Sequence, residues 1–184
     1  LILKINIIYI MKKFSNIILP FNKKLVLNNQ YQPLFSSYST YTELGFLNHP
    51  GSFGYKRKFH FHEGIDFYCE LNDKVLSICN GTIHSIELFT GEEINSPWWN
   101  TTYCVIVKTV FGFMNYGEIQ PNSTLYVGKK IKKGDFIGNS LTVLKKNKNR
   151  PQTMLHFELY SLNTKKFGIS WNIDQPKPIN LIDP

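Results

Sequence analysis

Short stretches in which hydrophobic and polar residues alternate begin at about Leu47 and continue towards the end of the chain. The clearest stretch is Thr153–Leu159, where Leu155, Phe157 and Leu159 form one apolar face. Because the side chains of a strand point alternately to its two faces, a period of two predicts a β-strand. The period of 3.6 residues that is typical of a helix does not appear over any useful length. The pattern therefore predicts an all-β domain.

Glycine-containing dipeptides indicate where the predicted strands turn back. Asn80-Gly81 is the residue pair that favours the positive φ angles of a type I′ turn, and Phe111-Gly112 separates a second pair of apolar stretches. A further short strand is expected around Phe136–Gly138. We therefore expect antiparallel hairpins, with Lys74–Cys79 pairing with Thr82–Leu88, and Thr102–Val110 pairing with Phe113–Ile119.

Composition supports a globular chain with an anionic partner. The 184 residues suit one domain, and 42% hydrophobic with 15% aromatic residues argue against disorder. A net charge of +8 suits nucleic acid, an acidic membrane surface or a cell-wall polymer. No basic face with interleaved aromatic residues is evident, so nucleic acid is not the favoured partner, and a monomer is expected. The three cysteines contain no Cys-x-x-Cys pair, which predicts buried thiols rather than a disulfide scaffold.

The first part of the chain differs in composition from the rest. Residues 1–42 contain lysines but no Asp or Glu. We expect residues 1–46 to form a basic N-terminal extension, either targeting or disordered, and residues 47–184 to form the β-domain. Secretion and organelle targeting would each explain such a start, as would AT-rich coding, so the compartment stays open. The apolar runs Ile5–Ile10 and Ile17–Pro20 are too short to span a bilayer.

Polar residues on two predicted strands have the spacing of a metal site. His62 and Asp66 are four residues apart, and His156 lies far along the chain. Two histidines and one aspartate can hold zinc and leave its fourth position open, as catalytic zinc sites do. Tyr116 and Glu118 have the same parity, which predicts that they face the same concavity. Each pattern alone is unspecific, because strand histidines are often simply hydrogen-bonded and Glu118 could be a surface carboxylate.

Five segments then occur in an informative order. They are Phe53-Gly54 through His62-Glu63-Gly64-Ile65-Asp66, Val75 through Asn80-Gly81-Thr82-Ile83, Tyr116-Gly117-Glu118-Ile119, Val127-Gly128 through Gly134-Asp135-Phe136-Ile137-Gly138, and Met154-Leu155-His156-Phe157-Glu158. Together they resemble the lysostaphin- or LytM-type zinc metallopeptidases over about residues 48–184. The resemblance implies a compact antiparallel β-sheet core with a zinc-floored groove. It also implies Zn²⁺ ligands at His62, Asp66 and His156, and cleavage of short peptides in bacterial peptidoglycan.

The chain departs from that family at two positions. Glu118 and Met154 stand where the family has two further histidines that are not ligands, so the chain resembles a variant branch. One hypothesis is a zinc peptidase in which Glu118 activates zinc-bound water as general base and Tyr116 replaces a hydrogen-bond donor. The alternative is an inactive zinc-binding pseudoenzyme that binds peptides or cell-wall fragments. Met154 is expected to be apolar packing beside the groove, because methionine does not donate hydrogen bonds.

A loop with adjacent tryptophans is the remaining candidate for substrate contact. Trp98 and Trp99 lie within Ser96-Pro97-Trp98-Trp99-Asn100. Exposed aromatic residues are common anchors in binding sites, so these two are expected to wall the substrate groove. Packing in the core is the equal alternative.

Overall fold

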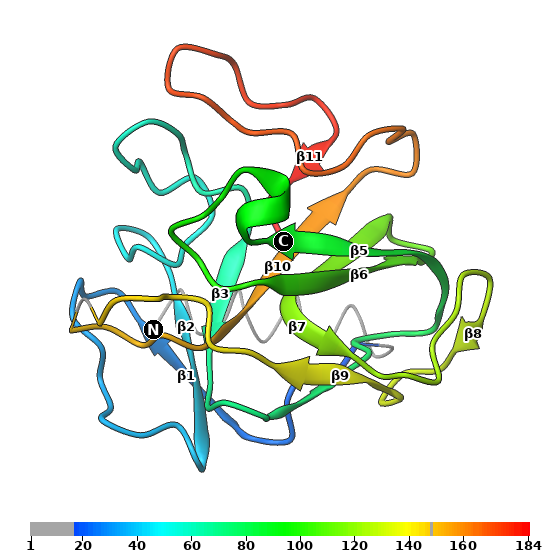
Figure 1. Ribbon diagram of the computed structural model, residues 1–184, viewed down its shortest axis with the longest axis horizontal. Coiled ribbons are helices and arrows are strands. Elements are labelled where there is room, and N and C mark those ends of the chain that lie inside the picture. The colour runs from blue at the N-terminus through cyan, green and yellow to red at the C-terminus, as the bar shows by residue number, and fades with distance from the viewer. Residues whose placement is uncertain (1–16, 148) are drawn as a thin grey trace, which may run out of the picture.

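The computed structural model describes residues 17–147 and 149–184, and its regular structure is almost entirely β-sheet (Figure 1). The strands are β1 (Lys24–Asn28), β2 (Tyr41–Gly45), β3 (Ile65–Tyr68), β4 (Lys74–Leu76), β5 (Gly81–Thr90), β6 (Thr102–Lys108), β7 (Phe113–Pro121), β8 (Lys130–Ile131), β9 (Phe136–Ser140), β10 (Met154–Tyr160) and β11 (Leu181–Ile182). A short 3₁₀ helix, η1 (Glu92–Ile94), follows β5. The all-β prediction is confirmed. Within the described ranges, no helix has the length and hydrophobicity needed to cross a bilayer.

Strand β10 lies at the centre of a single sheet. The order along the sheet is β1-β2-β3-β10-β7-β6-β5-β8, while β9 pairs with β7 and β4, and β11 pairs with β10. All of these pairs are antiparallel except β1 with β2. That parallel pair needs a crossover, which residues 29–40 supply. The sheet is therefore mixed at one edge and antiparallel around the candidate site.

Two strands within residues 17–46, β1 and β2, belong to the sheet, so the expectation of a disordered extension is wrong for these strands. Strand β2 pairs with β3, and Phe21, Tyr38 and Glu43 are buried. The Glu43 carboxylate accepts hydrogen bonds from Asn28 Nδ2 at 2.7 Å and from the Tyr38 hydroxyl at 3.0 Å. This satisfied buried carboxylate ties β1 and the following loop to β2, which in turn pairs with β3. Residues 1–16, including Ile5–Ile10, lie outside the described part of the chain.

One predicted hairpin is confirmed and the other is wrong. Strands β6 and β7 pair across Phe111-Gly112 as expected. Strand β4 instead pairs with β9, and β5 pairs with β6 and β8. Gly81 does not make a type I′ turn; a Cβ atom there would lie 2.5 Å from Val107 and 2.7 Å from the Lys108 carbonyl. Glycine is needed at this position because β5 and β6 approach each other closely there.

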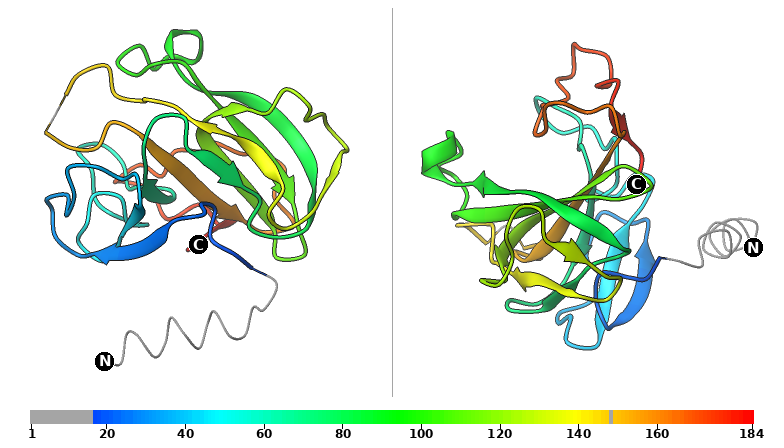
Figure 2. Two further views of the ribbon diagram at one scale, coloured as in Figure 1. Left: turned by 90° about the horizontal axis from the view of Figure 1, so that it is seen from below. Right: turned by 90° about the vertical axis from the view of Figure 1, so that its right-hand side faces the viewer.

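The hydrophobic core lies inside the curve of the sheet. Figure 2 shows that the sheet is strongly curved, and strands from several parts of it contribute to one buried cluster. The most buried members include Val75, Ile83, Val105, Ile137 and Leu155. The three cysteines are buried with free thiols, as predicted. The opposite face of β10 is thereby left for polar residues.

Candidate metal centre

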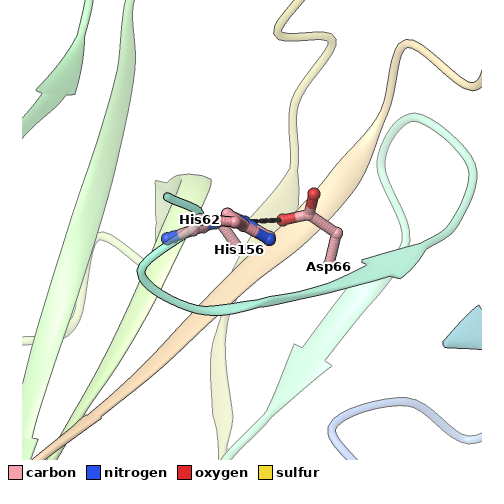
Figure 3. A group of neighbouring side chains, drawn as sticks. All are labelled: His62, Asp66 and His156. Atoms are coloured by element: carbon pink, nitrogen blue, oxygen red, sulfur yellow. Dashed lines mark hydrogen bonds and ion pairs between the residues drawn. The ribbon is translucent and has the colours of Figure 1, made fainter. Parts of the chain in front are cut away.

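Two neighbouring strands bring the three predicted ligands together. Asp66 in β3 stands directly opposite His156 in β10, and His62 lies in the loop that enters β3 (Figure 3). Gly64 allows that loop to cross close to β10. A Cβ atom at this position would lie 2.4 Å from the Phe157 carbonyl oxygen and 2.9 Å from His156 Nε2. Only glycine fits there, because any larger side chain would displace a ligand.

The donor atoms of these residues converge on one point. His62 Nε2 lies 3.1 Å from His156 Nδ1 and 3.2 Å from Asp66 Oδ1, and His156 Nδ1 lies 2.9 Å from the same oxygen. All three side chains are buried, and one ligand atom from each lies within 4.8 Å of the others. Two imidazole nitrogens and one carboxylate oxygen form a donor set that suits zinc. The residues therefore fit a metal ion.

The His62 ring is fixed and neutral. Its Nδ1 lies 3.0 Å from the carbonyl oxygen of Ser52, to which it donates when Nε2 carries the lone pair. Burial lowers the pKa of His62 to about 4, and the positive charge of Arg57 adds to the effect against the opposing influence of Asp66. A metal ligand must be the neutral imidazole, so burial prepares this ring for coordination.

The His156 ring is held by a second carboxylate. Its Nε2 lies 3.2 Å from Glu158 Oε1, and Glu158 Oε2 accepts from Asn115 Nδ2 at 2.6 Å and from the Tyr160 hydroxyl at 2.9 Å. Burial would lower the pKa of His156, but its hydrogen bonds to Asp66 and Glu158 raise it well above the usual value. A carboxylate behind a ligating histidine orients the ring and makes it more basic. Glu158 is a site residue that the sequence prediction did not include, although its position two residues after His156 was the available signal.

Asp66 lies between two histidines and Arg57. Burial would raise its pKa, but the two histidines hold the carboxyl well below its usual range. Arg57 adds a longer contact, with its guanidinium nitrogen 3.5 Å from Asp66 Oδ2. The aspartate therefore stays ionised and available as a ligand.

Glu118 reaches the cleft because the backbone of β7 is irregular there. Its φ of 66° lies in the left-handed region, and the pairing of β6 with β7 shifts register between Tyr103 and Val105. The carboxylate lines the same cleft as Asp66 and His156. Its Oε2 is shielded from solvent and has no hydrogen-bond partner among the described residues. Burial, reinforced by the negative charge of Asp66, raises the pKa of Glu118 to about 8.

The expectation that Tyr116 shares a face with Glu118 is wrong. Tyr116 is fully buried in the core, where its ring centroid lies 5.4 Å from that of Phe157. Its hydroxyl accepts a hydrogen bond from the Ile78 amide at 3.0 Å. Strand alternation predicts a common face only for regular backbone, and the positive φ of Glu118 breaks the alternation. Tyr116 is therefore not brought to the metal group.

A cleft of about 900 Å³ runs over the metal group. Met154, Trp98 and Trp99 all line it, together with Glu118 and His156. Met154 packs with Tyr38 and Tyr68 and is only 8% exposed, whereas Trp98 is 62% exposed. Met154 and both tryptophans, which the sequence predicts beside the groove, thus line one cleft.

The chain is similar to one known protein family and to several solved structures. The family model described as Peptidase family M23 matches residues 60–168. No curated protein sequence matches the chain significantly. The catalytic domain of the antimicrobial peptidase lysostaphin from Staphylococcus simulans is 19% identical, with a TM-score of 0.49 over 71% of this chain and 88% of that one. The crystal structure of cbpa from L. salivarius REN is 20% identical, with a TM-score of 0.40 over 62% of this chain and 69% of that one.

Proposed function

The chain belongs to peptidase family M23, and on that premise we propose that it is a zinc metallopeptidase that hydrolyses peptide bonds in peptidoglycan or related short peptides. The observation that carries the proposal is the convergence of His62, Asp66 and His156 beside a cleft that is lined by Asp66, by His156 and by a carboxylate with an oxygen that has no partner among the described residues. Together they provide a metal-ligand set and a proton acceptor in one water-accessible place.

The metal is held by the three converging donors. His62 would bind through Nε2, His156 through Nδ1 and Asp66 through a carboxylate oxygen, since these atoms face one another. When bound, a zinc ion polarises the carbonyl of a peptide and lowers the pKa of a water molecule towards neutrality. Three protein ligands leave a coordination position open, which is the arrangement of catalytic rather than structural zinc sites.

Glu118 is the proposed general base. Its Oε2 has no partner among the described residues, so it is free to accept the proton of the attacking water. The same carboxyl group would then give that proton to the amine that leaves. A cation beside a carboxylate lowers its pKa, so metal binding would bring Glu118 from about 8 towards the ionised form at neutral pH.

The remaining polar residues position the ligands. Glu158 accepts a hydrogen bond from Nε2–H of His156, which leaves Nδ1 free to bind the metal. Asn115 and Tyr160 fix the Glu158 carboxylate in turn. The side chains of Trp98 and Trp99 wall the cleft in which the peptide would lie.

A zinc-binding pseudoenzyme that retains peptides without cleaving them is the second candidate. The position of Met154 favours this candidate. Met154 lines the cleft and offers no hydrogen-bond donor to a developing oxyanion. Loss of one such donor costs about a hundred- to a thousandfold in rate in other enzymes, which still leaves measurable catalysis.

Hydrolysis of purified peptidoglycan and of oligoglycine peptides by the zinc-loaded chain tests the proposal. Release of new amino groups that stops when a chelator removes the metal, and returns with added zinc, is the expected result. A His156→Ala variant should contain less zinc and should be inactive. Equal zinc in both proteins would contradict the ligand assignment, and binding of peptides without cleavage would favour the pseudoenzyme.

A further inference from the structure

Arg150 is a cation in the cleft, and part of its hydrogen-bonding capacity is not used by the described residues. It precedes β10 by a few residues and lines the same cleft as His156 and Glu118. One terminal guanidinium nitrogen is shielded from solvent and has no hydrogen-bond partner in residues 17–147 and 149–184. Among the described residues, no carboxylate lies within ion-pair distance of it. A shielded donor without a partner is energetically unfavourable. A ligand in the cleft that accepts a hydrogen bond from this nitrogen would remove the cost.

The Arg150 side chain is also oriented. Its guanidinium carbon lies 3.6 Å from the centroid of the Tyr31 ring. Tyr31 belongs to the connection between β1 and β2, which the β9–β10 loop approaches in Figure 1. Stacking on an aromatic ring holds the plane of the guanidinium and leaves its N–H edge available. The orientation is therefore set before a ligand arrives.

The other arginine of the cleft differs in this respect. Arg57 is engaged by protein oxygens, with one guanidinium nitrogen 3.5 Å from Asp66 Oδ2 and 3.4 Å from the Pro50 carbonyl oxygen. The nearby carboxylate of Glu63 accepts from the Trp171 amide at 2.9 Å. Partners within the chain thus account for these charged groups but not for Arg150.

We infer that Arg150 binds a carboxylate of the peptide that occupies the cleft. The planar N–H fork of arginine matches a carboxylate in a two-point contact, and a partly shielded site strengthens it. The inference rests on the proposed function, because it adds a specificity for acidic peptides to the peptidase site. Two sources supply the same chemistry, namely a free C-terminal carboxylate and the side chain of an acidic residue.

The test measures binding of matched peptides to the zinc-loaded chain by calorimetry. Pentaglycine is compared with pentaglycine amide, and Gly-Gly-Glu-Gly-Gly amide with Gly-Gly-Gln-Gly-Gly amide. The first pair tests a C-terminal carboxylate, and the second tests a side-chain carboxylate. In at least one pair, the acidic member is expected to bind about tenfold more tightly. Arg150→Gln should abolish that preference, and Arg150→Lys should retain only part of it, because lysine keeps the charge without the planar fork.

Lys146→Gln provides the matched control. Lys146 is an exposed lysine of the same loop that does not line the cleft, so the variant loses the same charge and should keep the full preference. The inference is overturned if neither acidic peptide binds more tightly than its neutral partner, or if Arg150→Gln keeps the preference. Hydrolysis of all four peptides is followed separately. A preference that depends on Arg150 without any hydrolysis would contradict the proposed function and leave the carboxylate site standing.

Discussion

His156 stands directly opposite Asp66 across the β10–β3 pair, and its Nδ1 atom lies 2.9 Å from Asp66 Oδ1. Strand pairing therefore fixes the distance between two ligands that are ninety residues apart in the chain. The same contact joins the two ligands directly to each other when no metal is bound. Burial would lower the pKa of His156, but its hydrogen bonds to Asp66 and Glu158 raise it well above the usual value, so a metal ion at Nδ1 would compete with a proton.

Zinc binding should accordingly release a proton from His156. Near neutral pH the metal-free ring carries the extra proton, because its pKa lies well above the usual value. Zinc affinity should therefore rise with pH. Calorimetric titration with zinc in buffers of different ionisation enthalpy measures the release, which should approach one proton per site. The same zinc affinity at about pH 6 and about pH 8 would contradict this account.

Glu158→Gln should weaken zinc binding by about ten- to a hundredfold, because the glutamine amide no longer supplies the negative charge behind His156. Competition with a chromogenic chelator measures the affinity. Glu63→Gln is the matched control, since Glu63 lines the cleft but hydrogen-bonds to the Trp171 amide rather than to a ligand. Equal weakening in both variants would assign the effect to the charge of the cleft as a whole.

Burial of Glu118 should make the metal-free chain less stable as the pH rises. The folded-state pKa of about 8 lies above the usual glutamate value of 4.5, so the folded chain binds the proton more tightly than the unfolded chain. The contribution of this group is thus fully present below about pH 4.5 and is lost as the pH rises through 8. Glu118→Gln should remove this loss, which is on the order of a few kcal/mol. Urea denaturation of both metal-free proteins at several pH values measures it, and parallel pH profiles would contradict the prediction.

Trp98→Ala should raise KM several-fold and change kcat little, because the side chain lines the cleft and is not one of the candidate metal ligands. Tyr126→Ala is the control, since Tyr126 is 64% exposed, close to the 62% of Trp98, and lies outside the cleft. Steady-state kinetics on a soluble peptide substrate separate the two parameters. A fall in kcat at unchanged KM would show that Trp98 acts on the reaction rather than on binding.

Regular strands made part of the site predictable from the sequence. The alternation in β10 places Met154, His156 and Glu158 on the cleft side, and β3 contributes Asp66. The pattern fails where the backbone is irregular. Glu118 adopts a positive φ without being glycine, so alternation misplaces Tyr116, which lies in the core. The residue types near Glu118 do not predict this irregularity, because it depends on the register between β6 and β7.

Composition and turn patterns also gave two predictions that differ from the structure. The lysine-rich, acid-free start suggests an extension, yet β2 pairs with β3, and the buried Glu43 of β2 ties β1 and the following loop to it by hydrogen bonds. Asn80-Gly81 suggests a tight turn, yet Gly81 is needed for the approach of β5 to Val107. In both cases a tertiary contact outweighs the local preference. Arg150 could not be singled out from the sequence, because its significance depends on Tyr31, far away in the chain.

The rate of peptide hydrolysis by Glu118→Gln, measured at equal zinc content, tests the central claim most directly. Glutamine preserves the shape of the side chain but does not accept the proton of the attacking water. We predict that the variant retains its zinc and cleaves peptidoglycan peptides about a hundred- to ten-thousandfold more slowly than the parent chain. Equal rates in the two proteins, or no cleavage by the zinc-loaded parent chain, would contradict the account.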